Sequence, residues 1–150
     1  MNVAPPSPTG DTGDPWLPAP PVPLDAARER EMRAFVTSSI LTAGGARVTD
    51  RPPCATWFLL SWLCQNYPVV LHGSNDPTIR TFQPTRPRDR SADAFSKQSA
   101  MFATSDGIWA TFYAVLDHAT PDLAFMKGAL QFAAPAPPSG WSAMRYFFSL

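Results

Sequence analysis

A histidine followed by a glycine stands where a short apolar run ends, and its type and position could support chemistry. The run is Val69-Val70-Leu71, and His72 follows it directly. An imidazole at the end of an interior strand can point into a cleft, where it exchanges protons or hydrogen bonds near neutral pH. A histidine in this position can equally be satisfied by neighbouring backbone groups, so His72 has both a functional and a structural interpretation.

Two polar side chains close to His72 raise the possibility of a hydrolase. Ser74 and Asp76 have the types of a nucleophile and a carboxylate, but the groups of a catalytic triad converge from separate parts of a fold. The chain also lacks the Gly-x-Ser-x-Gly pattern that presents a serine on a sharp turn. We therefore place a hydrolase that uses Ser74 or Ser105 behind the alternatives below.

A long polar loop, residues 73–99, follows the histidine. A guanidinium group matches phosphate oxygens in a bidentate way, and the four arginines of this loop are Arg80, Arg86, Arg88 and Arg90. Asp89 and Asp93 are interleaved with them, so a solvated face is the default interpretation and phosphate contact the minor one. The apolar anchors of the loop are Ile79, Phe82 and Phe95.

Two helices are expected before the histidine. Asp25 can cap the first, which ends at Gly44-Gly45, and its apolar face comprises Met32, Phe35, Val36 and Ile40. Pro52-Pro53 suits the first turn of the second, residues 54–65, which is apolar almost all round. We expect this second helix to be buried, because it is too short to span a membrane.

A strand, a cap and a helix are expected after the loop. Ala100-Met101-Phe102-Ala103 predicts a short strand, and Thr104, Ser105 or Asp106 can cap a helix over residues 107–117. Two more strands are predicted within residues 123–132 and 144–148. Because the chain stops on an apolar strand, we expect either an edge strand there or a chain cut short.

The composition fits one folded domain behind a tail. Of the 150 residues, 45% are hydrophobic, and twelve basic residues balance twelve acidic ones. We therefore expect a core but no general binding to nucleic acid or to an anionic membrane. Eight of the 18 prolines lie between Pro5 and Pro23, so residues 1–24 predict a disordered tail and residues 25–150 a single α+β domain. This tail does not resemble a secretory signal, and we expect a cytoplasmic protein.

The two cysteines predict no disulfide between them and no metal site. Cys54 and Cys64 are ten residues apart along one expected helix, too far to bridge. With His72 and His118 as the only histidines, their spacing matches no structural zinc pattern. We expect both thiols to be free and buried.

Two segments together resemble the ADP-ribosyltransferase fold. They are Val-Val-Leu-His-Gly-Ser at residues 69–74 and Ala-Met-Phe-Ala-Thr-Ser-Asp at residues 100–106, which leads into an aromatic helix. In the branch of that family with a His-Tyr-Glu signature, a first strand ends in His-Gly-Ser or His-Gly-Thr. A second strand of the type Tyr-Phe-Ala then leads into a helix with an aromatic residue. The overlap spans residues 69–117, about a third of the chain.

The resemblance implies an NAD-binding cleft in a fold where N-terminal helices pack on a small mixed or antiparallel sheet. His72 would be the catalytic residue and would hydrogen-bond the ribose next to the nicotinamide. Gly73 would allow the cofactor close to the backbone, and Phe112 or Tyr113 would stack on the nicotinamide. The other cofactor-binding residues of this cleft would be Ser74, Thr104 and Ser105.

The chain departs from the family pattern at two places. Met101 stands where the family often has a tyrosine, so one aromatic wall of the pocket would be missing. Members that transfer ADP-ribose use a late glutamate, whereas the glutamates here are Glu29 and Glu31 in the first expected helix. Loss of such a carboxylate costs a factor of ~100 or more in rate. Either the catalytic strand lies beyond a truncated end, another polar residue substitutes, or the domain binds without catalysis.

A non-enzymatic interaction module is the alternative from a different class. In it, the proline-rich tail and the loop of residues 76–99 engage a protein partner. His72 is then only a packed residue, and no nucleotide is bound.

Overall fold

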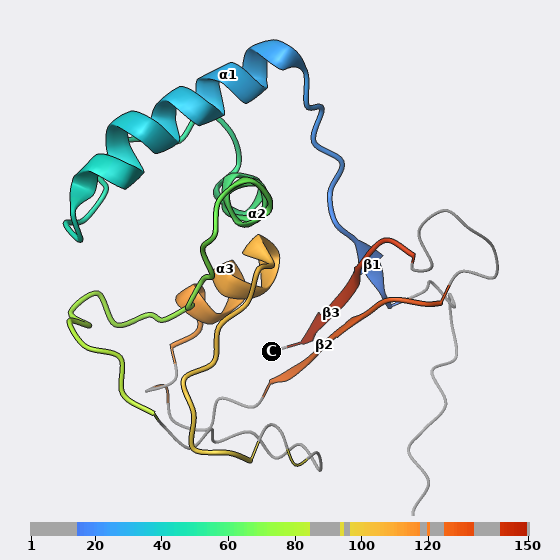
Figure 1. Cartoon of the computed structure of the whole chain (residues 1–150). Helices are drawn as coiled ribbons and strands as arrows, with labels where there is room; N and C mark the ends of the chain where they lie inside the picture. The colour runs from blue at the N-terminus through green and yellow to red at the C-terminus, as the bar shows by residue number, and fades with distance from the viewer. Residues whose placement is uncertain are drawn as a thin grey trace, which may run out of the picture. The chain divides into compact units, whose positions relative to one another are not determined.

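The computed structural model describes residues 15–84, 94, 97–117, 120, 125–133 and 142–149, which group into two compact units. The helical unit takes its described residues from Val22–Thr120, and the sheet unit takes them from Met1–Pro21 and Pro121–Leu150. Within the described residues the fold class is α+β, as predicted, with helices in one unit and an antiparallel sheet in the other (Figure 1). Residues 25–150, which were expected to form a single domain, contribute to both units. The first and last parts of the sheet unit lie too far apart in sequence for a local pattern to connect them.

The first helix, α1 (Ala26–Phe35), begins at the predicted cap. The Asp25 carboxylate accepts a hydrogen bond from the backbone N–H of Arg28 at 2.8 Å. Such a cap satisfies one of the backbone donors that the first turn leaves unpaired. The predicted apolar face is confirmed, because Met32 and Val36 are fully buried and Phe35 packs beside them.

Beyond Phe35 the helix changes its winding before it ends. It continues as a π-helical segment, η1 (Val36–Ile40), and a short 3-10 helix, η2 (Leu41–Ala43). Gly44 and Gly45 follow with φ angles of 57° and 89°, a left-handed conformation that glycine adopts without the steric cost of a Cβ. The predicted end of the helix at these two glycines is confirmed.

The second helix, α2 (Thr56–Asn66), supplies the other half of the apolar core. Its buried residues Leu59, Trp62 and Leu63 join Met32 and Val36 of the first helical segment in one cluster. The expectation of a buried helix over residues 54–65 is confirmed with bounds shifted by one or two residues. None of the helices in the described ranges is long and apolar enough to cross a membrane.

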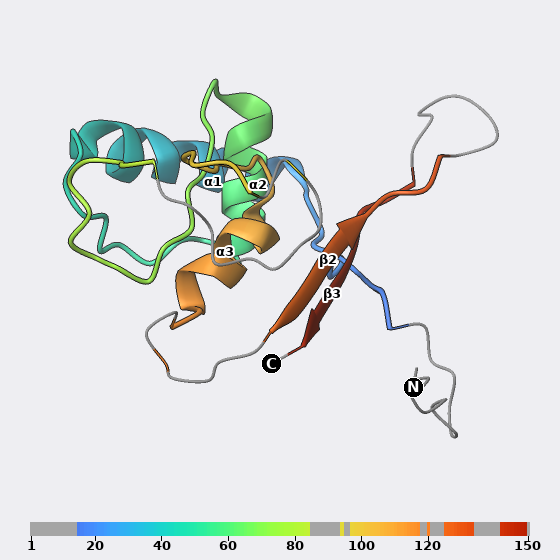
Figure 2. The same cartoon turned by 90° about the horizontal axis from the view of Figure 1, so that it is seen from below.

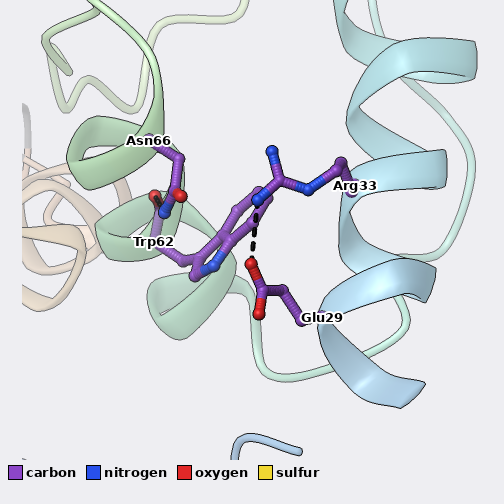
Figure 3. A network of polar contacts seen from close by, with 4 residues as sticks. All are labelled: Glu29, Arg33, Trp62 and Asn66. Carbon is purple, nitrogen blue, oxygen red and sulfur yellow. Dashed lines mark hydrogen bonds and ion pairs between the residues drawn. The ribbon is translucent and has the colours of Figure 1, made fainter. Parts of the chain in front are cut away.

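A surface contact between α1 and α2 borders this core (Figure 3). The guanidinium carbon of Arg33 lies 5.3 Å from the centre of the Trp62 ring, and a guanidinium nitrogen pairs with Glu29 at 2.8 Å. On α2 itself, the side-chain amide of Asn66 donates to the carbonyl oxygen of Trp62 at 2.9 Å. Arg33 and Glu29 are solvent-exposed, so the cation–π contact contributes only ~0.5–1 kcal/mol. The buried apolar cluster therefore dominates this interface.

The third helix, α3 (Gly107–Val115), starts directly on the backbone of α2. Asp106 is its cap and accepts from the backbone N–H groups of Ile108 and Trp109 at 2.8 and 3.1 Å, as predicted. The N–H of Gly107 donates to the hydroxyl oxygen of Ser61 on α2 at 2.9 Å. A Cβ on Gly107 would lie 1.9 Å from the carbonyl oxygen of Trp57, so only glycine permits this approach.

The two apolar runs that were expected to be strands are not strands. Leu71 and Thr104 exchange two backbone hydrogen bonds, at 2.8 and 2.9 Å, and form an isolated antiparallel bridge. Val70 is 69% exposed, so the prediction of an interior strand at residues 69–71 is wrong, as is that of a strand at residues 100–103. A β-branched run favours extended backbone, but only a partner in register over several residues makes a strand.

The described residues of the sheet unit form three antiparallel strands in the order β1-β3-β2 (Figure 1), and Figure 2 shows β2 and β3 side by side. They are β1 (Leu17–Pro18), β2 (Met126–Leu130) and β3 (Arg145–Ser149). The two later strands lie within or near their predicted ranges. The expectation of an edge strand at the C-terminal run is wrong, because β3 pairs with both other strands. β1 lies inside the stretch that was expected to be a disordered tail.

An aromatic contact holds the first part of this unit on its last strand. The indole of Trp16 lies 5.8 Å from the ring of Phe147, and Phe147 is the cross-strand partner of Gly128. A Cβ on Gly128 would lie 2.6 Å from the indole. The glycine therefore makes room for Trp16 to lie against the strand pair, and this explains how so short a strand as β1 stays in place.

Candidate functional site

A pocket of about 250 Å³ lies in the helical unit next to His72. Its wall comes from the beginning of α2, from the segment around the histidine and from one face of α3. The lining residues are Thr56, Leu60, Leu71, His72, Gly73, Ser74, Ala110, Thr111 and Ala114. A mainly apolar wall with a few polar groups is typical of small-molecule sites, so this pocket is the candidate site.

The imidazole of His72 is held by a single backbone contact. Its Nδ1 lies 2.8 Å from the carbonyl oxygen of Phe102. Since a carbonyl can only accept, Nδ1 carries the proton, and Nε2 is the nitrogen left for a ligand. The bridge between Leu71 and Thr104 fixes the preceding residue. A backbone group thus satisfies one nitrogen of His72, as the structural interpretation expects, and the residue also lines the pocket.

Gly73 is pressed against α3. A Cβ at this position would lie 2.2 Å from the carbonyl oxygen of Ala110 and 2.7 Å from the Cβ of Tyr113. Any side chain here would push the histidine segment, residues 71–74, away from α3. The segment would have to move because the nearest atom, the carbonyl oxygen of Ala110, belongs to the backbone. The close approach of the two chain segments therefore accounts for the glycine, and the same approach forms the pocket wall.

The residues after Gly73 form a hydrogen-bonded turn. The hydroxyl oxygen of Ser74 accepts from the backbone N–H of Asp76 at 3.1 Å. Asp76 in turn accepts from the hydroxyl and the backbone N–H of Thr78, at 2.6 and 2.8 Å. These bonds lower the pKa of the Asp76 carboxyl, and the bond from the Thr78 hydroxyl is the larger of the two causes. The side-chain amide of Asn75 donates to the carboxylate of Asp117, just beyond α3, at 3.3 Å. The turn therefore has hydrogen bonds within itself and one to the segment that follows α3.

Thr104 and Ser105, two of the expected cleft residues, lie beside the pocket and are not part of its wall. The hydroxyl oxygen of Thr104 accepts from the backbone N–H of Asp106 at 3.0 Å. Ser105 is exposed. Thr104 therefore positions the histidine segment and the entry to α3, and it does so through its backbone bridge and its hydroxyl.

Phe112 and Tyr113, the expected stacking residues, also lie outside the pocket wall. They form an aromatic cluster with Trp109, in which the ring centres of the three pairs are 5.6–6.3 Å apart. The pocket is lined by the smaller residues of the same helix, Ala110, Thr111 and Ala114. The structure thus brings His72, Gly73 and Ser74 together and leaves the two aromatic residues in a neighbouring cluster.

Three polar or aromatic side chains of the site did not emerge from the sequence as site residues. Thr56 and Thr111 line the pocket, and their signal is a small polar residue among large apolar ones on otherwise apolar helices. Phe82 contacts His72, with ring centres 5.1 Å apart. It was expected only to anchor the loop. The arginines at positions 86, 88 and 90 lie outside the described residues, and Arg80 is exposed and is not part of the pocket wall.

The carboxylates of Asp76 and Asp106 and the thiols of Cys54 and Cys64 are not part of the pocket wall. None of the lining residues is acidic, and Asp76 and Asp106 are engaged in the local hydrogen bonds described above. Cys54 and Cys64 are free, and burial raises the pKa of both thiols, which disfavours the reactive thiolate. Among the described residues, no group of three His, Cys, Asp or Glu side chains is placed to hold a metal ion.

Comparisons with known proteins do not place this chain in a family. No protein-family model, curated protein or solved structure matches it. A functional interpretation therefore depends on the pocket, on the first motif segment that lines it and on the contact between this segment and the second one.

Proposed function

We propose that the helical unit is an NAD-binding domain of the ADP-ribosyltransferase type, whose pocket takes the nicotinamide and the adjoining ribose. The observation that carries the proposal is the 2.8 Å contact between His72 Nδ1 and the carbonyl oxygen of Phe102. It fixes the ring and leaves Nε2 for a ligand hydroxyl at the pocket wall. The resemblance assigns the same role to this histidine, namely a hydrogen bond to the ribose.

The arrangement of the two motif segments supports this proposal. The His-Gly-Ser segment and the segment before α3 are neighbours, joined by the Leu71–Thr104 bridge and by the His72–Phe102 contact. The helix that follows the second segment forms part of the pocket wall. Segments about 30 residues apart in sequence are thus in direct contact beside the pocket.

The size of the pocket suits one half of the dinucleotide. Pockets for drug-sized ligands usually measure ~300–1,000 Å³, and this one measures about 250 Å³. A planar ring with part of its sugar fits such a volume, whereas the adenosine half would lie outside it. Small residues on the helix side, Ala110 and Ala114, keep this space open.

Binding without transfer is the activity we propose for this chain. Its two glutamates, Glu29 and Glu31, belong to α1, and Glu29 is paired with Arg33. Among the described residues, no acidic side chain lines the pocket. A cationic sugar formed there would lack the electrostatic stabilisation that typically accelerates such a step by a factor of ~100 or more. We therefore propose NAD as a bound ligand and expect nicotinamide release by this chain at the background rate.

Calorimetry with the full chain and three ligands tests the proposal. We expect NAD and nicotinamide mononucleotide to bind, and ADP-ribose, which lacks the nicotinamide, to bind at least about tenfold more weakly. His72→Asn is the informative variant, since an asparagine amide can replace Nδ1 at Phe102 but cannot replace Nε2. It should lose about tenfold in affinity for NAD while it melts at an unchanged temperature.

His72→Gln is the matched control, because its side chain extends to the position of Nε2. It should retain more affinity than His72→Asn. Equal affinities of the wild-type protein and His72→Asn would overturn the site, and so would an ADP-ribose affinity equal to that of NAD. Chromatography of the same mixtures for free nicotinamide tests the absence of transfer.

Two contacts favour the pocket over the alternative of a protein-interaction module. Phe82, from the loop that the alternative assigns to a partner, contacts His72. β1, from the stretch assigned to a tail, pairs with β3. A pull-down with and without residues 1–24 separates the two functions, because a module that uses the tail loses its partner on truncation, whereas NAD binding by the helical unit persists.

A further inference from the structure

Phe82 is a large apolar side chain that lies against the candidate site yet keeps most of its surface open. Its ring centre is 5.1 Å from that of His72, and the two rings are inclined by 73°. The side chain is 55% exposed. An edge-to-face contact of this kind is favourable for aromatic pairs. The imidazole of His72 occupies at most one face of the phenyl ring, so the other face is available to a ligand.

The turn that begins at Ser74 brings this ring to the histidine. The Ser74 hydroxyl and the Asp76 carboxylate accept hydrogen bonds within the turn, and Thr78 supplies two of the donors. Asn75 connects the same turn to Asp117 beyond α3. Phe82 follows four residues after Thr78, so its approach to His72 starts from a backbone that is fixed at several points.

The aromatic residues that the resemblance implied as a wall are occupied elsewhere. Phe112 and Tyr113 pack on Trp109, and neither of them makes a ring contact with His72. Met101 replaces the tyrosine expected before α3, and it is exposed. Within the described residues, Phe82 is the aromatic side chain whose ring contacts that of His72, and it does so from outside the pocket wall.

We infer that Phe82 supplies the aromatic wall of the site and stacks on the planar ring of a ligand held by His72. Because the phenyl ring contacts the imidazole itself, a planar ring attached to a group bound at Nε2 would reach stacking distances of ~4.5–7 Å. This inference rests on the proposed function, because it names nicotinamide as the stacked ring. It assigns the recognition of that ring to the loop after the histidine, not to α3.

Calorimetry with NAD on the full chain, combined with proton NMR of nicotinamide mononucleotide, tests this inference. Phe82→Leu keeps an apolar side chain but removes the ring, and the site is exposed enough for the variant to fold. We expect affinity to fall about three- to tenfold in Phe82→Leu and to be retained in Phe82→Tyr. The nicotinamide protons should shift upfield with the wild-type protein and shift less with Phe82→Leu.

A second exposed phenylalanine provides the matched control. Phe132 in the sheet unit is 57% exposed, and Phe132→Leu should leave NAD affinity unchanged. If His72→Asn weakens binding and Phe82→Leu does not, the inference is overturned while the proposed function stands. If the wild-type protein binds neither ligand, the proposed function is overturned and the inference with it.

Discussion

The two faces of α2 differ in how they meet their neighbours. Toward α1, Leu59, Trp62 and Leu63 interlock with buried side chains and fill the space between the helices. Toward α3, the contact is backbone on backbone at Gly107, and Thr56 and Leu60 line an open pocket nearby. A helix that is apolar almost all round thus has one face that gives stability and one that keeps a cavity open.

The cavity exists because of the spacing between α3 and the histidine segment. Two glycines set this spacing, Gly107 against α2 and Gly73 against α3. Close backbone contact at these points holds the segments in place, while Ala110 and Ala114 are too small to fill the remaining volume. Substitutions on the two faces should therefore separate stability from binding.

The largest effect is expected on the packed face. Met32 is fully buried, so Met32→Ala leaves a cavity and should lower the free energy of unfolding by about 3 kcal/mol. NAD affinity of the folded protein should stay within about twofold, because the pocket lies on the other side of α2. Urea unfolding and calorimetry measure the two quantities. Met101→Ala, at a 48% exposed methionine, should change stability by less than about 0.5 kcal/mol.

A smaller loss of stability is expected at the contact between α2 and α3. Alanine usually favours a helix over glycine by ~1 kcal/mol, but a Cβ on Gly107 would lie 1.9 Å from the carbonyl oxygen of Trp57. Gly107→Ala should therefore destabilise the protein by about 2 kcal/mol and weaken NAD binding as α3 moves. Ser61→Ala removes only the hydrogen bond to Gly107 and should cost about 1 kcal/mol. A stabilising Gly107→Ala would contradict the close contact.

The third substitution should weaken ligand binding more than it lowers the free energy of unfolding. Gly73→Ala forces the histidine segment off α3, where a Cβ would lie 2.2 Å from the carbonyl oxygen of Ala110, and should cost about 1 kcal/mol because the segment can shift. NAD affinity should fall at least tenfold, or about 1.4 kcal/mol, since His72 moves with it. Gly45→Ala is the control. It costs a similar ~1 kcal/mol through its φ of 89° but has no atom within 4 Å, so its affinity should not change.

Local signals were sufficient to predict the helices and their ends. Asp25 and Asp106 cap as expected, and the turn at Gly44-Gly45 ends the first helical segment. These predictions succeeded because a cap or a left-handed glycine acts within four residues of itself. The apolar face of α1 could also be predicted, since its apolar residues recur at helical spacing and the charged residues lie on the opposite face.

Contacts between distant segments could not be predicted in the same way. Trp16 and Arg145 meet across 129 positions, and nothing in the proline-rich stretch marks Leu17 as a strand residue. The two faces of α2 look alike in sequence, so periodicity did not show which one borders the pocket. At the site, His72, Gly73 and Ser74 were predicted from one contiguous motif. Thr56, Thr111 and Phe82 were missed because each belongs to a different segment.

The smallest effect concerns the turn that carries Phe82. Hydrogen bonds from Thr78 lower the pKa of Asp76. A carboxyl whose pKa is lower in the folded state contributes stability above its unfolded pKa, and that contribution disappears as the pH falls through the folded value. Thr78→Val removes the hydroxyl donor, which is the largest cause, and keeps the backbone N–H. The pKa of Asp76 should therefore rise toward its ordinary value, so the turn should loosen at a higher pH than in the wild-type protein.

Carbon-13 NMR of the Asp76 carboxyl across the acid range measures this shift, and the ring protons of His72 report on the same samples. Because Phe82 contacts His72, protonation of Asp76 should change the ring-current shift of the histidine in the wild-type protein. The change should occur at a higher pH in Thr78→Val. Thr81→Val, in the same loop but outside these hydrogen bonds, should match the wild-type titration. An Asp76 that titrates as in a short peptide would show that the hydrogen bonds from Thr78 do not form in solution, so that the turn could not hold Phe82 beside His72 through them.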